Sequence, residues 1–178
     1  MVRPTLSLRA RALSYLAARE HSRLELARKL ARHDEDSAAI DSLLDTLEVQ
    51  GLLSTERFVA SVLHRRAPRL GAARLRQELR AKGVPDEAMR DSLQGLAESE
   101  EARAREVWQR RFGSPATDSR EMARQARFLM ARGFSGEIVR RILRQAGSRT
   151  TEDHTGDHSG EQMDDQAHDE SGSHPGDD

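Results

Sequence analysis

The feature that most constrains this chain is an apolar pattern that occurs three times, with copies 49 and then 50 residues apart. Each copy opens with a leucine and continues with apolar residues ten and fourteen positions later. The copies begin at Leu30, Leu79 and Leu129. In the second and third copies a glycine also follows the leucine by four residues, at Gly83 and Gly133. Self-similarity at a fixed period predicts a tandem array of like units, each burying part of its surface against the next.

Helical periodicity runs through the first 150 residues, and strand patterns are nearly absent. From Ile40 to Leu47 the apolar residues fall at helical spacing, which places them on one face of a helix. Ser22 and Glu25 have the spacing of a capping box at a helix start. The pattern predicts nine helices, at residues 6–19, 22–33, 37–50, 54–66, 69–82, 86–98, 99–112, 118–132 and 135–146.

Several of these segments end at a glycine, where a left-handed terminal residue suits a helix. These glycines are Gly51, Gly83, Gly113, Gly133 and Gly147. Grouped by the repeat, the helices predict an all-α fold: an elongated tandem array of three three-helix modules. The expected modules are residues 1–51, 52–98 and 99–147, and we expect residues 148–178 to form a disordered tail because they contain only one large apolar residue, Met163.

Charge divides the chain into two parts. Residues 151–178 contain ten Asp or Glu, four His and no Lys or Arg, whereas residues 1–150 carry a net charge of +9. A basic body predicts an anionic partner, although charge alone does not name it. The chain has no cysteine and no apolar run long enough to span a membrane, so we expect a soluble, cytoplasmic protein that does not bind membranes.

The arginines of the body fall in stripes on the predicted helices. On the segment 118–132 they lie opposite Met122, Leu129 and Met130, which we therefore expect to face the core. One such stripe is typical of a solvated surface, but three on consecutive modules favour an extended basic surface for phosphates or acidic protein. The candidate partner-binding residues are Arg69, Arg76, Arg80, Arg120, Arg124, Arg127, Arg140 and Arg144.

No pattern in the sequence indicates catalysis. Glycine-rich phosphate loops, H-E-x-x-H and G-x-S-x-G are absent, so we predict a non-enzyme without cofactor or metal. The stretch HDED at residues 33–36 lies where acidic residues cap the following helix, which we prefer to metal binding. Trp108 and Phe112 are four residues apart, and we expect them to pack in a core rather than stack on bases.

Two motifs in the first and second modules resemble those of the RecX family of bacterial recombinase regulators. The first lies in LEVQGLLSTERFVASVLHRR at residues 47–66, and the second in GAARLRQELRAKGVPDEAMRDSL at residues 71–93. The third module, RFLMARGFSGEIVRRIL, is similar to the closing repeat of the family. The chain departs from the pattern at Thr55, where an acidic residue is usual, and in the first module, which lacks the glycine. The matching positions are Gly51, Leu52, Leu53, Glu56, Arg57, Phe58, Gly71, Arg74, Leu75, Leu79, Lys82, Gly83 and Val84.

The resemblance implies a small protein that binds the RecA recombinase along the groove of the RecA–DNA filament. Family members limit filament growth and inhibit strand exchange and the ATPase and coprotease activities of RecA, in DNA repair and the SOS response. We expect a monomer that contacts RecA and single- or double-stranded DNA. The alternative is a DNA-binding transcription regulator that uses helices 22–33 and 37–50 as a helix-turn-helix. The acidic Asp41, Asp45 and Glu48 on the second of these helices argue against it, because they would repel DNA phosphates.

The acidic tail generates a prediction of its own. A flexible segment keeps its carboxylates at about millimolar concentration near the body, so it should compete with anionic partners. Removal of residues 151–178 should tighten binding of a single-stranded oligonucleotide at about 50 mM salt, and the gain should shrink at physiological salt as screening increases. Fluorescence anisotropy with the full-length and truncated proteins measures this. Equal affinities at low salt would contradict competition by the tail.

Overall fold

The structure, a computed structural model, describes residues 6–33 and 36–152 and contains nine α-helices and no strand in these residues. The first three helices are α1 (Leu8–Ala18), α2 (Arg23–Leu30) and α3 (Ser37–Val49). The next three are α4 (Thr55–Arg66), α5 (Ala72–Ala81) and α6 (Asp86–Gly95), with a short 3-10 helix η1 (Ala67–Arg69) before α5. The last are α7 (Ala97–Arg111), α8 (Ser119–Ala131) and α9 (Gly136–Glu152).

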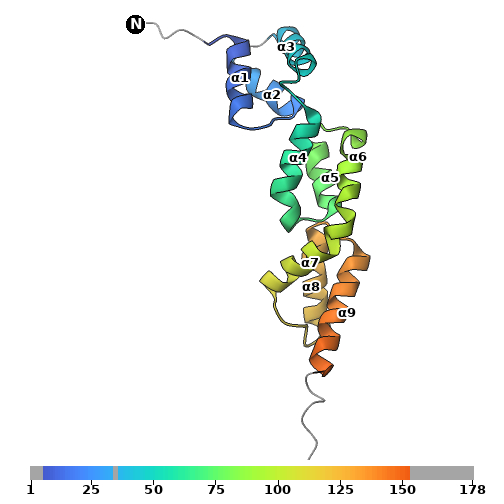
Figure 1. Cartoon of the computed structure of the whole chain (residues 1–178). Helices are drawn as coiled ribbons and strands as arrows, with labels where there is room; N and C mark the ends of the chain where they lie inside the picture. Colours follow the sequence, from blue (N-terminus) through green and yellow to red (C-terminus); the bar gives the residue numbers. More distant parts are fainter. Residues whose placement is uncertain (1–5, 34–35, 153–178) are drawn as a thin grey trace, which may run out of the picture.

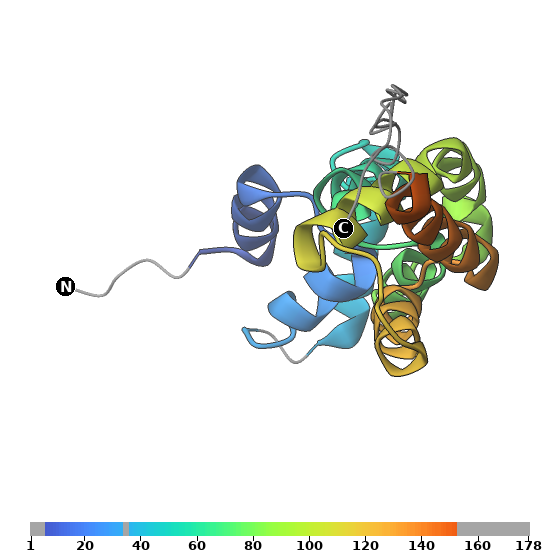
Figure 2. The same cartoon turned by 90° about the horizontal axis from the view of Figure 1, so that it is seen from below.

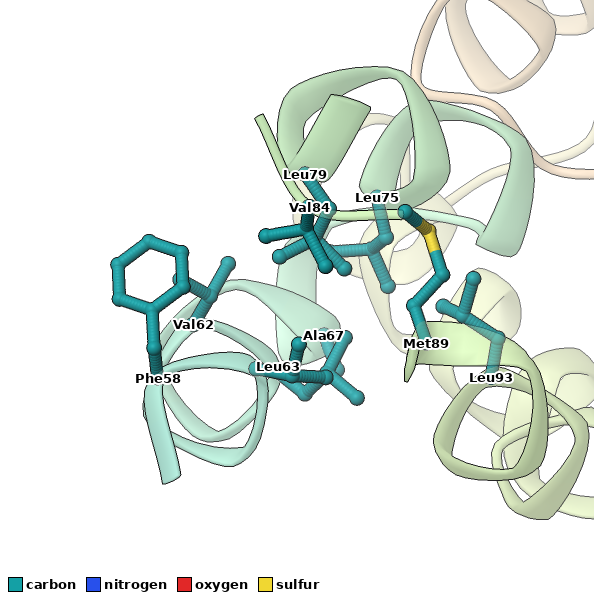
Figure 3. Close-up of a cluster of buried hydrophobic side chains, with 10 residues drawn as sticks. Phe58, Val62, Leu63, Ala67, Leu75, Leu79, Val84, Met89 and Leu93 are labelled. Carbon is teal, nitrogen blue, oxygen red and sulfur yellow. The ribbon is translucent and has the colours of Figure 1, made fainter. Parts of the chain in front are cut away.

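The helices form three groups that follow one another along an elongated molecule (Figure 1). Each group encloses its own apolar cluster, so the expected array of three-helix modules is confirmed. The cluster of the second module is formed by Phe58, Val62 and Leu63 of α4 against side chains of α5 and α6 (Figure 3). Seen along the array, α1 stands out to one side of the two following modules (Figure 2).

The repeated pattern marks equivalent places in these cores. Leu30, Leu79 and Leu129 are all completely buried. After the second and third of these leucines, Gly83 and Gly133 adopt φ angles of 77° and 84°. The next residue then donates its backbone N–H to the leucine carbonyl, at 3.1 Å in the second module and 3.4 Å in the third. The glycine thus ends one helix and turns the chain into the next, because only glycine enters the left-handed region without strain.

Polar side chains fix the helix starts that the sequence predicts. Ser22 accepts the backbone N–H of Glu25 at 3.1 Å, and Asp118 accepts that of Glu121 at 2.7 Å. Asp36 accepts two backbone N–H groups at the start of α3, so capping by this residue of the HDED stretch is confirmed. Asp34 and Glu35 of the same stretch lie outside the described residues.

Two expectations about local structure are wrong. The segment 69–82 is not one helix, because Pro68 and its neighbours form η1 and α5 begins only at Ala72. Gly147 does not end a helix: α9 continues through it to Glu152, since a single glycine costs a helix only about 1 kcal/mol. The disordered tail expected at residues 148–178 stays a prediction, because residues from 153 onward lie outside the described part of the chain.

The boundary between the first two modules also differs from the expected one. Leu53 is buried in the cluster of the first module, although the expected boundary followed residue 51. Ser54 then caps α4 by accepting the N–H of Arg57 at 3.2 Å. We propose that the second module begins at Ser54.

The second and third modules are joined by a backbone-to-backbone contact at two glycines. The N–H of Gly71 donates to the carbonyl of Arg132 at 2.9 Å, and the N–H of Ala73 donates to the carbonyl of Gly133 at 3.3 Å. A Cβ atom at Gly71 would lie 2.2 Å from the carbonyl oxygen of Gly133. The contact therefore requires the absence of a side chain at both positions.

Two charged residues of α7 strengthen this junction from the side. Glu100 is 8% exposed and accepts the N–H of Ala72 at 3.0 Å, so its carboxylate lies at the start of α5, where a negative charge is favourable. Arg103 donates to the carbonyls of Ala67 and Leu70, both at 2.7 Å. Residues of the third module thus satisfy backbone groups that the second module leaves open at its lower end.

The first and second modules meet through ion pairs instead. The carboxylate of Glu25 on α2 bonds to Lys82 at the end of α5 and, at 3.0 Å, to Arg19. Glu20 pairs with Arg57 at 2.8 Å. Burial alone would raise the pKa of Glu25, but the hydrogen bonds from Lys82 and Arg19 outweigh it and hold the pKa below its ordinary value. This junction consequently depends on charge, and we expect it to weaken as the pH falls toward the pKa of Glu25.

The glycine contact gives a direct test of the junction between the second and third modules. Gly71→Ala should lower the free energy of unfolding by at least about 2 kcal/mol, because the added methyl group meets backbone that cannot move away. Urea denaturation followed by circular dichroism measures the change. Gly95→Ala is the matched control: a Cβ at Gly95 meets nothing within 4 Å, so this variant should be neutral or more stable by up to about 1 kcal/mol. Equal stabilities of the two variants would contradict the contact.

Candidate interaction surface

The described residues contain no group of three or more His, Asp or Glu side chains placed to hold a metal ion. None of their helices is long and apolar enough to cross a membrane. Trp108 is 6% exposed and donates its indole N–H to Gln125 at 2.8 Å, so the expected core role of this residue is confirmed. The candidate residues for contact with a partner are therefore the arginines.

All eight arginines predicted to bind a partner are exposed. They do not form one continuous stripe, however. Arg76 and Arg80 of α5 line a hollow of about 290 Å³ together with Arg90 and Asp86 of α6. Arg140 and Arg144 lie on α9 beside an apolar groove, and Arg69 lies on η1 and lines a different hollow from that of Arg76 and Arg80. Arg120 and Arg127 make no ion pair with any described residue.

Arg80 is partly neutralised by its neighbour. Its Nε donates to Asp86 at 2.7 Å, and its second nitrogen bonds to the other carboxylate oxygen. This bidentate pair raises the pKa of Arg80 and lowers the pKa of Asp86. The net charge of the hollow thus comes from Arg76 and Arg90 rather than from Arg80.

Four arginines without a carboxylate partner among the described residues lie together near the junction of the second and third modules. With two phenylalanines they form what we call the arginine–phenylalanine cluster, which consists of Arg69, Arg111, Phe112, Arg124, Phe128 and Arg132. The rings of Phe112 and Phe128 meet edge to face with their centroids 5.0 Å apart. The guanidinium of Arg132 lies 3.5 Å from the centroid of Phe128, and those of Arg111 and Arg124 lie 5.7 and 5.8 Å from that of Phe112.

The four arginines of the cluster have no carboxylate within 4 Å among the described residues. Arg110, next to Arg111, differs because it pairs with Glu106 at 2.6 Å. Burial lowers the pKa of Arg132, and the charge of Arg111 lowers it further, although Arg132 remains cationic near neutral pH. Cation–π contacts with the rings hold these like charges together. The cluster is therefore suited to an anion that presents several oxygens, such as a phosphate backbone or a carboxylate-rich surface.

The sequence predicted only part of this cluster. Arg69 and Arg124 were among the eight candidates, but Arg111 and Arg132 were not, and Phe112 was assigned to the core. Phe112 is partly buried and packs against the core of the third module, as expected, but Arg111 and Arg124 also lie over its ring. Phe128 is partly buried as well and has Arg132 over its ring. The spacing of Phe128 and Arg132, one helical turn apart, was the only indication in the sequence.

The face of α8 opposite its arginines also differs from expectation. Leu129 is buried, but Met122 and Met130 are 49% and 48% exposed and do not belong to the core. Gln125 takes the buried position instead, because its side chain accepts the N–H of Trp108 from α7. The three modules, their separate small cores and the exposed arginines define the class of this protein. It is a tandem three-helix repeat protein with a charged surface.

Comparisons with known proteins place this architecture in one family. Three family models match in order along the chain: the first three-helix domain of RecX at residues 9–47, the second at 56–93 and the third at 98–143. The chain belongs to the RecX family. Residues after 143 lie outside all three models.

Individual relatives agree with this assignment. The chain is 59% identical over 153 residues to the regulatory protein RecX of Leptothrix cholodnii, covering 86% of this chain and 98% of that protein. It is 53% identical to the regulatory protein RecX of Ralstonia nicotianae, covering 81% and 91%. The fold is similar to the crystal structure of RecX from Lactobacillus salivarius, with a TM-score of 0.67 at 19% identity over 79% of this chain and 95% of that one.

The cluster generates a prediction that separates it from a diffuse basic surface. Arg111→Glu with Arg124→Glu should weaken binding of a single-stranded oligonucleotide at low salt by more than about tenfold, and should flatten the dependence of affinity on salt. Arg120→Glu with Arg127→Glu is the matched control, because it makes the same change of charge on exposed arginines without aromatic partners. This control should lose no more than about threefold.

Fluorescence anisotropy over a range of salt concentrations compares the two double variants. Each exposed substitution should change the free energy of unfolding by no more than about 0.5 kcal/mol, which circular dichroism checks. Equal losses of affinity in the two variants would show that charge, and not the cluster, governs anion binding.

Proposed function

We propose that this protein binds the RecA–DNA filament and regulates RecA. The observation that carries the proposal is the match of all three modules, in order, to a family of regulatory proteins. The surface supports it, because the exposed arginines are suited to an acidic protein or to DNA. The protein acts by binding alone, as a cytoplasmic monomer.

The shape of the molecule suits such a partner. Three small modules in a row present a long, narrow surface, which can contact several successive protomers of a helical filament (Figure 1). The glycine contact makes the second and third modules one unit, while the first is attached mainly through ion pairs. In this arrangement the protein occupies the filament groove, limits extension, and inhibits the ATPase, strand-exchange and coprotease activities of RecA in DNA repair.

A DNA-binding transcription regulator is the second candidate. Its recognition helix would be α3, which follows α2 after a short turn. Asp41, Asp45 and Glu48 of α3 all pair with Arg23 of α2, at 3.3, 2.7 and 2.9 Å. One arginine does not offset three carboxylates, so α3 remains acidic and would be repelled from a DNA groove. This charge distribution favours the RecA filament.

Titration of the protein into RecA filaments on single-stranded DNA tests the proposal. ATP hydrolysis and filament length should both fall at about one copy of this protein per few RecA protomers, since occupation of the filament blocks its extension. A coupled ATPase assay and electron microscopy measure the two quantities. Unchanged hydrolysis and filament length, with normal DNA binding by RecA, would reject the proposal. Selection of a defined duplex sequence by the protein alone would favour the transcription regulator.

A further inference from the structure

An open apolar groove lies between α8 and α9, the second and third helices of the third module. Its volume is about 550 Å³. We call it the α8–α9 groove, and it is lined by Ser119, Met122, Ala123, Ala126, Val139, Arg140, Leu143 and Arg144. Leu143 is only partly buried, whereas its equivalents Leu44 and Leu93 are buried. At this position of the repeat the third module thus partly exposes an apolar side chain that the other two modules bury.

The three modules differ in the ion pairs that join their second and third helices. In the first module Arg23 reaches from the second helix to Asp41 and Asp45 on the third. In the second module Arg80 at the end of the second helix bonds to Asp86 at the start of the third. By the 50-residue offset, the positions of Arg80 and Asp86 are taken in the third module by Met130 and Gly136.

No ion pair joins α8 to α9 among the described residues. The basic groups of α9 nearest the groove are also unpaired there: Arg140 and Arg144 have no described carboxylate within 4 Å. Arg141, which points toward α7, is instead paired with both Glu101 and Glu137, at 2.8 Å each. The groove therefore combines an apolar floor with two arginines on its rim, and none of the residues that line it is acidic.

We infer that the α8–α9 groove is the docking site for an acidic amphipathic segment of the RecA protomer, with an apolar side chain inserted beside Met122 and carboxylates paired to Arg140 and Arg144. The inference rests on the proposed function. It adds which surface of this protein contacts RecA and which kinds of side chain meet there. A partner of this kind matches both parts of the groove, because it buries the apolar floor and neutralises the rim.

Other occupants fit the groove less well. DNA would satisfy the two arginines but leave the apolar floor in contact with phosphates. The acidic tail of this chain carries one large apolar residue, Met163, so it offers little to bury. The arginine–phenylalanine cluster lies elsewhere on the third module. The module therefore has two separate surfaces, one suited to anions and one that is a groove with an apolar floor and a basic rim.

Binding of variants to RecA filaments on single-stranded DNA tests the inference. Met122→Asp should weaken binding by about tenfold or more, since it places a charge in the apolar floor. Val49→Asp is its matched control, because Val49 is an apolar residue that is 90% exposed on the first module, and this variant should bind within about twofold of the wild type.

The rim is tested in the same way. Arg140→Glu with Arg144→Glu should weaken binding by about tenfold or more. The control is Arg28→Glu with Arg32→Glu, two exposed arginines four residues apart on the first module, which should lose less than about threefold. Circular dichroism verifies that all four variants fold. If the groove variants bind as tightly as their controls while the wild-type protein binds filaments, the inference is wrong and the proposed function stands.

A photo-crosslinking amino acid in place of Met122 identifies what occupies the groove. The expected product is a crosslink to a RecA segment that contains carboxylates beside an apolar side chain, located by mass spectrometry. Crosslinks confined to DNA, to a second copy of this protein or to its own tail would overturn the inference. Absence of filament binding by the wild-type protein would overturn the proposed function and this inference with it.

Discussion

The contact between the backbones at Gly71 and Gly133 determines how much of the molecule behaves as one body. Without side chains at these positions, the turn after α8 can approach the start of α5 closely enough for direct N–H to carbonyl bonds. The same contact places Arg132 beside Arg69, two residues before Gly71, and so assembles the arginine–phenylalanine cluster from two modules. The close contact leaves no room for side chains between the two backbones. The charged residues beside the glycines therefore lie on the surface.

The two junctions of the array differ in the forces that hold them. The one between the second and third modules is made of backbone hydrogen bonds and buried polar groups, which change little with salt or pH. The junction between the first and second modules is made of ion pairs around Glu25 and a cleft of about 690 Å³ lined by charged and apolar side chains of both modules. Partly exposed ion pairs contribute little to stability and are screened by salt, so the first module has more freedom to adjust to a partner.

Because the three modules are repeats, each surface of one module can be compared with the equivalent surfaces of the other two. An ion pair joins the second and third helices at Arg23 in the first module and at Arg80 in the second, where the adjacent hollow is lined by charged residues. In the third module no described ion pair joins these helices, and the groove between them is mainly apolar. Packing requires only the buried positions of the repeat, such as Leu30, Leu79 and Leu129, to stay alike. Exposed positions can vary without loss of the fold, and there the modules have acquired different chemistry.

By itself the sequence determined the three-module array, most helix starts and ends, and the family, because these depend on local periodicity, caps and turn glycines. It also indicated a basic body with candidate arginines. Only the tertiary structure decided which arginines lie together, because Arg69, Arg111 and Arg132 come from three different helices whose mutual positions depend on the glycine contact. The exposure of Met122 and Met130 was decided in the same way, since helical spacing shows that residues share a face but not whether a neighbouring helix covers it.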